Sequence, residues 1–249
     1  MLAIIGGSGL DSLPDLEAPV ATRVATPFGA PVPEVVSGRL CGLPMLFLAR
    51  HGAEHRSPPH RINYRANIHA LKSLGATDIV AVAAVGGISG HPPGSLAIPH
   101  QLIDYTSGRE ATFFDGSELP LTHVDFTRPY SLELRALCLA AARRAGVGVI
   151  DGGVYAAVNG PRLETAAEID RLQRDGATIV GMTGMPEASL AREAGVAYAS
   201  VALCINHAAG RGDSLHAIAH GDLARVLATG MQHVRALLRQ IALDRKEAS

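Results

Sequence analysis

Residues 2–9 read Leu-Ala-Ile-Ile-Gly-Gly-Ser-Gly, an apolar run that stops at a glycine-rich turn. Apolar residues in a short run without helical spacing predict a buried β-strand, and the glycines predict a tight turn directly after it. Further apolar runs of this kind occupy residues 45–49, 79–85, 149–158 and 196–205. The chain therefore starts on a strand that ends in a turn, and the same pattern returns along its length.

Segments with helical periodicity lie between these apolar runs. Tyr64, Ile68 and Leu71 fall on one face of a predicted helix. The other helix-like segments are residues 132–144, 164–175, 187–194 and 223–241, the last with Asp222 as its predicted N-cap. Alternation of strands and helices predicts an α/β fold with a central, largely parallel or mixed β-sheet flanked by helices. Because no repeat or linker-like composition interrupts it, we expect one domain over residues 1–249.

The composition excludes several classes of protein. Of the 249 residues, 47% are hydrophobic and 18% are charged, which is enough apolar material for a sizeable core. The formal net charge of −1 gives neither sign an excess, so we expect neither a general nucleic-acid binder nor a membrane binder. Cys41, Cys138 and Cys204 are far apart and form no CxxC pair, which argues against a disulfide framework and a structural zinc site.

The start of the chain shows no targeting signal. Residues 1–7 include no basic segment, and their apolar run is too short for a signal peptide. No apolar stretch reaches the length that spans a membrane. We therefore expect a cytoplasmic protein whose cysteines are reduced.

Small or polar residues follow several of the apolar runs. They are residues 6–9, Arg50 with His51, Gly86 with Gly87, Thr183 and Asn206. In open α/β sheets, ligands bind in the crevice at the carboxyl ends of the strands. We therefore expect these strand ends to form the functional site.

The first two strand ends carry groups that suit an anion. Backbone N–H groups of residues 6–9 can approach an anion closely, and Ser8 adds a hydroxyl donor. Residues 6–9 match neither a Walker A loop nor a dinucleotide fingerprint, since Ser12 stands where the latter has its third glycine. Arg50 offers a planar fork for phosphate, and His51 offers a second donor. The alternatives are a plain turn and a surface ion pair, but two such ends together favour a bound phosphate.

Glu164 and Asn206 are further candidate site residues. Glu164 follows a Gly-Pro loop at residues 160–161 and starts a predicted helix, where stabilising the helix N-terminus is the alternative role. Asn206 follows residues 198–205, whose apolar or small side chains predict a buried strand that delivers one polar group to a site. An Asn in a turn is the alternative.

Together these motifs make the chain similar to a known family. It resembles the trimeric purine nucleoside phosphorylase and methylthioadenosine phosphorylase family over nearly its whole length, specifically the bacterial branch of S-methyl-5'-thioinosine and 6-oxopurine nucleoside phosphorylases. The residues that carry the resemblance are 4–10, 26–29, 48–52, 63–67, 160–162 and 181–187. The resemblance implies a nucleoside phosphorylase fold and an enzyme of purine salvage, a pentosyltransferase that transfers the sugar to phosphate.

The resemblance also implies roles for individual residues. Those that would bind phosphate are Ser8, Arg50, His51, Ala83, Ala84 and Thr183. Those that would bind the nucleoside are Tyr155, Glu164, Met182, Asn206, Ala208 and His220, with His123 lent by a neighbouring subunit. Glu164 and Asn206 would act in catalysis, and the active sites of a homotrimer would lie at its subunit interfaces. Phosphate is then a co-substrate, and we expect no cofactor and no metal.

Three positions predict which purine is bound. In the resembling methylthioadenosine phosphorylases, Asp stands at the positions of Asn206 and Ala208, and a small hydroxyl residue stands at that of Glu164. An Asp accepts a hydrogen bond from the amine of adenine, whereas Asn can donate to O6 or N7, and Glu can accept from the N1–H of a 6-oxopurine. A mismatch would leave buried groups unsatisfied at a cost of about 1–3 kcal/mol each. We therefore expect hypoxanthine or guanine as the base.

The 5′ substituent of the sugar stays open at this point. His220 lies fourteen residues after Asn206, where the resembling nucleoside-type enzymes place a histidine for the 5′-hydroxyl, and His216 is a rival in the same loop. The wider sequence, including residues 184–188, is closer to the methylthioinosine enzymes. The alternatives for the function itself are a methylthioadenosine phosphorylase, a hydrolytic purine nucleosidase, a non-catalytic nucleoside-binding module and a nucleotide-dependent oxidoreductase.

Overall fold

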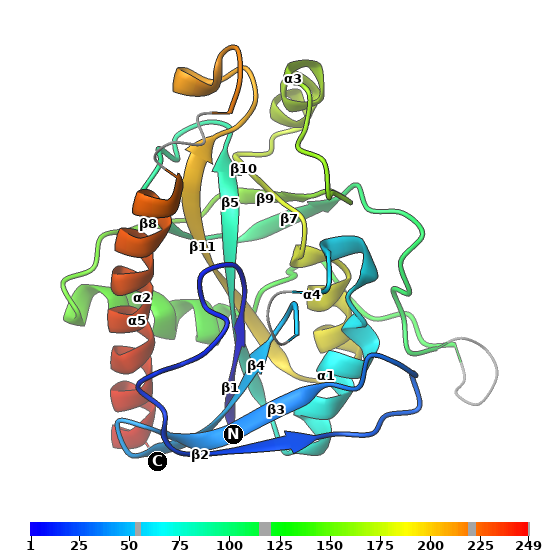
Figure 1. Ribbon diagram of the computed structural model, residues 1–249, viewed down its shortest axis with the longest axis vertical. Helices are drawn as coiled ribbons and strands as arrows, with labels where there is room; N and C mark the ends of the chain where they lie inside the picture. Colours follow the sequence, from blue (N-terminus) through cyan, green and yellow to red (C-terminus); the bar gives the residue numbers. More distant parts are fainter. Residues whose placement is uncertain (53–55, 115–120, 219–222, 249) are drawn as a thin grey trace.

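Parallel strands form the centre of the β-sheet and end at the same edge (Figure 1). The computed structural model describes residues 1–52, 56–114, 121–218 and 223–248. β1 (Leu2–Gly6) lies between β4 (Leu43–Ala49) and β5 (Asp78–Gly87) and runs parallel to both. β11 (Ala197–His207) pairs in parallel with the length of β5. The carboxyl ends of these strands therefore meet on one side of the molecule.

Further strands extend this centre into an eleven-stranded mixed sheet within the described residues. They are β2 (Glu17–Arg23), β3 (Glu34–Leu40), β6 (Leu96–Ile98), β7 (Gln101–Asp104), β8 (Val149–Asp151), β9 (Val154–Ala157) and β10 (Ile179–Gly181). β10 is antiparallel to β5, with Ile179 opposite Gly87 and Val180 opposite Gly86. The residues that follow β10 therefore return alongside the second half of β5.

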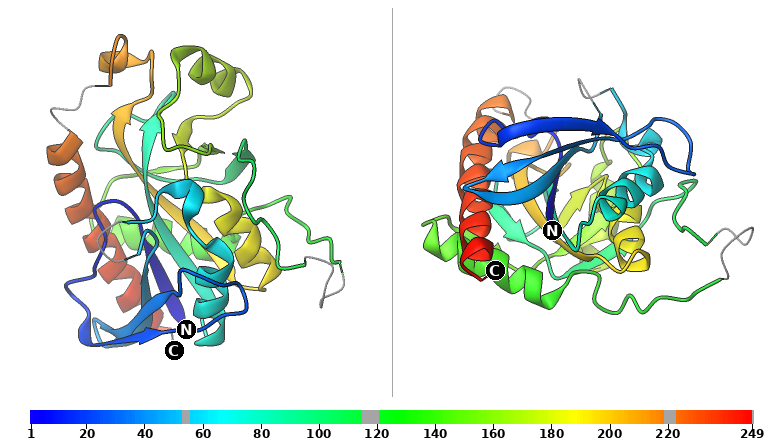
Figure 2. Two further views of the ribbon diagram at one scale, coloured as in Figure 1. Left: turned by 45° about the vertical axis from the view of Figure 1, so that its right-hand side comes forward. Right: turned by 90° about the horizontal axis from the view of Figure 1, so that it is seen from below.

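Helices cover both faces of the sheet (Figures 1 and 2). α1 (Tyr64–Ser73) and α4 (Gly184–Glu193) pack together on one face. α2 (Leu132–Arg144) and α5 (Leu223–Glu247) pack together on the other. α3 (Ala166–Arg174) lies near the edge at which the central strands end. Two short 3₁₀ helices complete the described elements, η2 (Pro59–Arg61) and η3 (Gly212–Ser214).

The alternation of side chains along β1 explains why the sheet is covered twice. Ala3 and Ile5 belong to the hydrophobic core under α1 and α4. Leu2 and Ile4 belong to the core under α2 and α5. Successive strand residues point to opposite faces, so a strand without polar residues needs a helical layer on each side.

The predicted α/β fold, with a mixed central sheet flanked by helices, is confirmed. One predicted strand is wrong in its extent, because the run 149–158 is divided into β8 and β9 at Gly152 and Gly153. Both glycines have φ of +111°, a conformation that other residues rarely adopt. The break lets β8 pair with β6 while β9 pairs with β10 and β7.

Helix boundaries also differ from the prediction, and the helix expected over 223–241 continues to Glu247. The helix expected over 164–175 begins at Ala166, because Thr165 is its N-cap. The helix expected over 187–194 begins at Gly184, with a kink at Met185, where φ is −122° and ψ is 142°. Asp222, the predicted N-cap of α5, lies outside the described residues, and the single domain over residues 1–249 stays a prediction.

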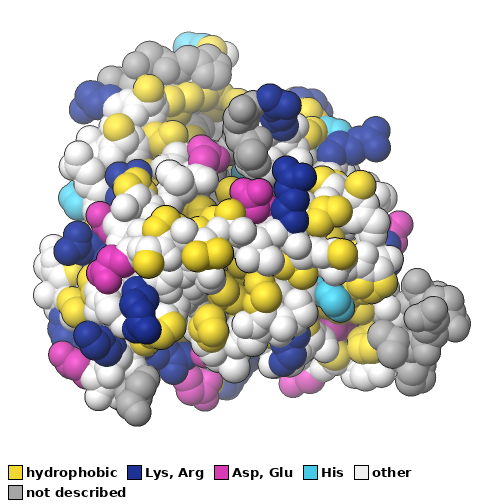
Figure 3. Space-filling model, turned by 60° about the horizontal axis from the view of Figure 1, so that its bottom comes forward, with side chains coloured by type: hydrophobic (Ala, Val, Ile, Leu, Met, Phe, Trp, Pro, Cys, Tyr) yellow, Lys and Arg dark blue, Asp and Glu magenta, His cyan; other side chains and the backbone are white. Residues whose placement is uncertain are grey.

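Basic and acidic side chains are interspersed on the face shown in Figure 3, in line with the formal net charge of −1. Cys41, Cys138 and Cys204 are free thiols. Among the helices of the described ranges, none combines the length and the hydropathy needed to cross a membrane. Within those same ranges, no three His, Cys, Asp or Glu side chains gather in a way that could hold a metal ion.

Candidate active site

A cavity of about 270 Å³ lies where the central strands end. The predicted site residues that line it are Ser8, Arg50, His51, Ala83, Ala84, Glu164, Met182, Thr183, Asn206 and Ala208. Most of them follow or end β1, β4, β10 and β11, whereas Ala83 and Ala84 lie in the second half of β5 and Glu164 comes from the loop before α3. Residues far apart in the sequence meet here because the central strands end at one edge.

The glycine turn after β1 packs directly against Arg50. A Cβ atom at Gly7 would lie 2.7 Å from Arg50 Nη1 and 2.7 Å from the main-chain oxygen of Val82, so a side chain does not fit there. The main-chain N–H of Arg50 donates a hydrogen bond of 2.9 Å to the oxygen of Gly6. The first two strand ends therefore form one unit, and Ser8 lines the cavity from it.

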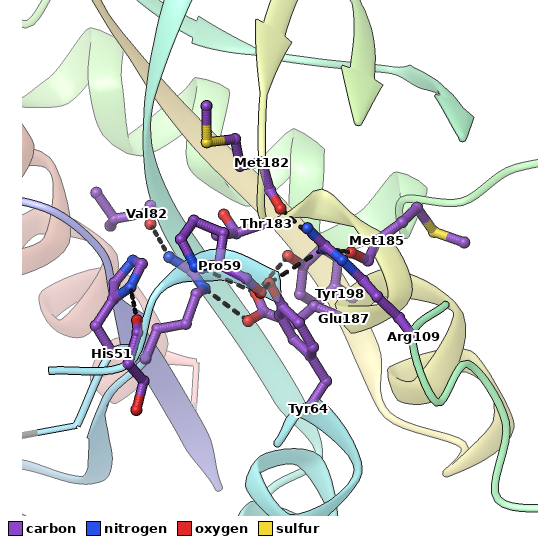
Figure 4. Close-up of polar contacts among 12 residues, drawn as sticks. His51, Pro59, Tyr64, Val82, Arg109, Met182, Thr183, Met185, Glu187 and Tyr198 are labelled. Atoms are coloured by element: carbon purple, nitrogen blue, oxygen red, sulfur yellow. Dashed lines mark hydrogen bonds and ion pairs between the residues drawn. The ribbon is translucent and has the colours of Figure 1, made fainter. Parts of the chain in front are cut away.

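Arg50 is held by the buried carboxylate of Glu187, which is labelled in Figure 4. Its Nε lies 2.7 Å from Glu187 Oε2, and its Nη2 lies 2.8 Å from Glu187 Oε1. Nη1 donates a bond of 2.7 Å to the oxygen of Val82. Burial by itself lowers the pKa of Arg50, but the attraction and hydrogen bonds of Glu187 outweigh it and raise the pKa. The surface ion pair considered from the sequence is wrong, since Arg50 is 2% exposed and Glu187 is 0% exposed.

His51 and Thr183 line the same cavity as Arg50. His51 Nδ1 lies 2.8 Å from the main-chain oxygen of Ser57, and it carries the hydrogen of that bond because a carbonyl oxygen only accepts. Thr183 stands at the N-cap of α4 but its side chain makes no capping bond. Both side chains line the cavity, so the polar groups predicted for an anion converge there.

Tyr155 corrects a prediction. It was expected beside the sugar, yet its side chain is 1% exposed and is not among the described residues that line the cavity. Cβ atoms at Gly181 and Gly184 would lie 2.0 Å from the Tyr155 oxygen and 2.9 Å from its Cε1. These two glycines let the ring pack behind Thr183, whose N–H donates to the Tyr155 hydroxyl at 3.4 Å. Tyr155 therefore supports the turn after β10 from behind.

Glu164 lies in the loop before α3, next to a capping box that Thr165 and Glu168 form at the helix start. The Thr165 hydroxyl accepts from the Glu168 N–H at 3.1 Å, and the Glu168 carboxylate accepts from the Thr165 N–H at 2.7 Å. Arg162 donates to both Glu168 oxygens at 2.8 and 2.7 Å. Thr165 and Glu168 already satisfy the helix start through these bonds, so the helix does not depend on Glu164 for its cap. Burial raises the pKa of Glu164 above its ordinary value.

Asn206 reaches the cavity from a bulge in β11. The register of β11 on β5 shifts between Cys204 and Asn206, and such bulges redirect side chains at the end of a strand. Asn206 Nδ2 donates a bond of 2.7 Å to the oxygen of His207. An amide nitrogen has a second hydrogen, which leaves one further donor beside the Oδ1 acceptor. Because Asn206 lies within β11, the alternative of an Asn in a turn is wrong. The nearby Ala208 is buried and adds no polar group.

Comparison with known proteins decides the family. A family model described as the phosphorylase superfamily matches residues 1–241. The chain belongs to this family. The resemblance that the sequence motifs predict, and the prediction that the chain is an enzyme, are confirmed.

Individual relatives are similar to this phosphorylase over almost its whole length. A probable S-methyl-5'-thioinosine phosphorylase of Pseudomonas syringae pv. tomato is 50% identical, over 96% of this chain and 97% of the relative. A probable 6-oxopurine nucleoside phosphorylase of Korarchaeum cryptofilum is 42% identical, over 96% and 91%. The solved methylthioadenosine phosphorylase of Schistosoma mansoni in complex with tubercidin is similar with a TM-score of 0.90 and 33% identity, over 99% and 92%.

Sequence reasoning missed three side chains that hold the site of this phosphorylase, namely Arg109, Glu187 and Tyr198. Glu187 stands in a motif that carries the family resemblance, but nothing in the sequence pairs it with Arg50, 137 positions away. Tyr198 is read from the sequence as one more residue of a buried strand, whereas its hydroxyl donates to Glu187 Oε1 at 2.8 Å. No sequence pattern marks Arg109.

Arg109 joins two segments that line the cavity of the phosphorylase. Its Nη1 donates to the oxygens of Met182, at 2.9 Å, and Met185. Its Nη2 donates to the oxygens of Val158 and Asn159, at 3.3 and 3.0 Å. One side chain therefore ties the turn after β10 to the start of the loop that carries Glu164.

The histidines predicted for the sugar are not brought to the cavity by the described part of the phosphorylase. His123 and His216 are exposed, and neither belongs to the cavity lining. His220 lies outside the described residues. Apolar side chains line part of the cavity instead, among them Pro59, Pro161, Leu163 and Ile218.

Proposed function

We propose that this phosphorylase splits the glycosidic bond of a 6-oxopurine nucleoside with phosphate, releasing the free base and a ribose 1-phosphate. The observation that carries the proposal is one cavity lined both by the anion-suited groups Ser8, Arg50 and His51 and by Glu164 and Asn206. Phosphorolysis of a purine nucleoside is also the activity named for the relatives described above.

The chemistry follows from the charges that such a cavity offers. Phosphate held by Ser8, Arg50, His51 and Thr183 lies beneath C1′ of the sugar. As the glycosidic bond lengthens, positive charge builds on the sugar, and the phosphate stabilises it. The purine leaves with negative charge on its ring, which the remaining N–H of Asn206 stabilises at N7. Holding phosphate and nucleoside in one cavity supplies much of the rate, because it removes the entropic cost of their encounter.

Glu164 and Asn206 support a 6-oxopurine as the base. A Glu164 carboxylate accepts from the N1–H that hypoxanthine and guanine have and neutral adenine lacks. The methyl group of Ala208 offers no acceptor for the amine of adenine. An adenine in this cavity would therefore leave polar groups unsatisfied, at about 1–3 kcal/mol for each.

The sugar of the preferred substrate carries a 5′-methylthio group, so that the substrate is S-methyl-5'-thioinosine. Pro59, Leu163 and Ile218 give the cavity apolar surface that suits a thioether better than a hydroxyl. The Pseudomonas relative at 50% identity bears the name of this activity. A homotrimer in which His123 of one subunit reaches the sugar in the next, with phosphate as co-substrate and no cofactor, completes the proposal, and the cytoplasmic location stays a prediction.

The test compares turnover of five nucleosides with and without phosphate: methylthioinosine, inosine, guanosine, methylthioadenosine and adenosine. We expect phosphate-dependent turnover that is fastest for methylthioinosine and slow for both adenine nucleosides. Fast cleavage of methylthioadenosine would overturn the choice of base, and faster cleavage of inosine would overturn the choice of sugar. Base release that needs no phosphate would identify a hydrolase, and binding without turnover would identify a binding module.

A further inference from the structure

Glu187 is a buried acid that contacts Arg50, one of the residues proposed to bind phosphate, but it does not itself line the cavity. It comes from the first turns of α4, four positions after Thr183, and its two oxygens bond Arg50 Nε and Nη2. Oε1 also accepts from the Tyr198 hydroxyl at 2.8 Å. Burial, followed by the neighbouring Glu187 charge, raises the pKa of Tyr198, so its hydroxyl keeps the hydrogen that it donates.

The hydrogen bonds of Arg50 leave a defined remainder. A guanidinium has five N–H donors in one plane. Glu187 takes the hydrogen on Nε and one on Nη2, and the Val82 oxygen takes one on Nη1. One hydrogen on Nη1 and one on Nη2 remain, and Gly7 lies against Nη1 without a side chain to cover it. Glu187, with two of these three bonds, and the Val82 oxygen together set the rotation of the guanidinium plane and thus the direction of the two remaining donors.

Stability alone is a poor explanation for this arrangement. Removing two charges from water costs several kcal/mol, and an apolar pair of similar size is often as stable as a buried ion pair. The start of α4, with its kink at Met185, reaches the proposed phosphate site in two ways: Thr183 lines the cavity, and Glu187 bonds Arg50. One short segment therefore sets the position of two groups that the proposed function assigns to phosphate.

We propose that Glu187, itself held by Tyr198, is a positioning residue that aims the free donors of Arg50 at phosphate and so sets the affinity for phosphate. The inference rests on the proposed function, in which Arg50 binds that anion. The negative charge of Glu187 also offsets the positive charge of Arg50, which weakens the net electrostatic attraction for phosphate. Phosphate is therefore recognised by directed N–H groups more than by net charge.

The test separates the Michaelis constant for phosphate from that for the nucleoside. Glu187→Gln keeps the shape of the side chain but replaces one acceptor by a donor that faces the guanidinium. We expect the KM for phosphate to rise by about tenfold or more, the loss of one charge-assisted hydrogen bond. Tyr198→Phe, which removes only the hydroxyl, raises it by about threefold. The KM for the nucleoside changes by less than about twofold in both, because neither residue contacts the nucleoside.

Glu193→Gln is the matched control. Glu193 lies on the same helix, and its carboxylate accepts from the Phe113 N–H at 2.8 Å, away from the cavity lining. Neither Michaelis constant should change in this variant. If Glu187→Gln fails to fold, as judged by circular dichroism, Tyr198→Phe decides alone.

The outcomes distinguish this inference from the proposed function. A wild-type enzyme whose turnover needs no phosphate ends the proposed function. If turnover does need phosphate but Glu187→Gln leaves its KM unchanged, lowers it, or raises both KM values together, the positioning role is wrong. A lowered KM would mean that the uncompensated charge of Arg50 matters more than its direction.

Discussion

Glu164 and Asn206 line the same cavity from separate parts of the chain, one from the loop before α3 and the other from the bulge of β11. The first offers a carboxylate, and the second offers one N–H that its bond to His207 does not use. An acceptor and a donor in one cavity suit the N1–H and the N7 of a 6-oxopurine.

Replacing Asn206 tests the donor of this pair. Asn206→Ala should cost about 2–4 kcal/mol of transition-state stabilisation, as for the loss of one preorganised donor. Asn206→Asp should lose about as much with inosine nucleosides and gain turnover of adenosine nucleosides, since its carboxylate accepts from the amine. The measurement is kcat/KM for both bases in each variant. Unchanged turnover in Asn206→Ala would remove Asn206 from the mechanism.

The raised pKa of Glu164 makes both stability and substrate binding depend on pH. Burial raises this pKa, so the folded protein keeps the Glu164 proton at pH values where the unfolded chain has released it. The stability contributed by this group is therefore present below the ordinary Glu pKa and is lost as pH rises through the raised value. Glu164→Gln should gain stability relative to wild type as pH rises through that window, measured by urea unfolding. The affinity of the wild type for the nucleoside should fall as pH drops through the raised pKa of Glu164, because the protonated acid is a poorer acceptor. The affinity of Glu164→Gln should not fall in this way, because its amide does not titrate.

Glu168 is the control of opposite sign. Its hydrogen bond with Arg162 lowers its pKa from 4.5 to about 2. The stability that Glu168 contributes is therefore present above 4.5 and is lost as pH falls toward about 2. Glu168→Gln should lose stability relative to wild type at neutral pH and converge with it in acid. Parallel pH profiles for the two variants would contradict both assignments.

The strand ends were predictable from the sequence because each combines an apolar run with a polar stop. Arg50 and Asn206 are found in this way, and the parallel sheet then brings them together. β2 was not predictable by this signal, since all seven of its residues are exposed and no apolar run marks it. β8 and β9 were merged because the apolar pattern passes across two glycines that break the strand.

Partners within the core were beyond the sequence for a physical reason. A Glu in a helical segment is usually solvent-exposed, and only the fold shows that Glu187 pairs with a residue 137 positions away. Tyr155 was placed beside the sugar by resemblance. Its actual position depends on Gly181 and Gly184, whose missing side chains let the ring pass behind the turn. Packing of this kind has no periodicity to read.

Arg109 should be needed for both stability and turnover. Arg109→Leu removes the donors to the oxygens of Met182 and Asn159, and it should lower the free energy of unfolding by about 1.5–3 kcal/mol. kcat/KM should fall as well, because the turn after β10 and the Glu164 loop lose their common support. Arg174→Leu, at an exposed position of α3, is the control and should change neither. Denaturant unfolding that is the same for Arg109→Leu and wild type would contradict this prediction.

Mixed oligomers can show whether His123 acts on a neighbouring subunit. His123 is exposed and lies outside the cavity lining of its own chain, so a direct role requires the cavity of another chain. His123→Ala should raise the KM for the nucleoside by about tenfold, the loss of one hydrogen bond. Asn206→Ala chains keep His123 but lack a working cavity.

Mixing His123→Ala chains with Asn206→Ala chains by co-expression should therefore restore activity above that of either parent. The restored sites combine an intact cavity from the first chain with His123 from the second. The control replaces the second chain by one that carries both changes, which supplies no His123 and should restore nothing. Activity that only averages the two parents would mean that His123 acts within its own chain or not at all, and the shared site would have to be abandoned.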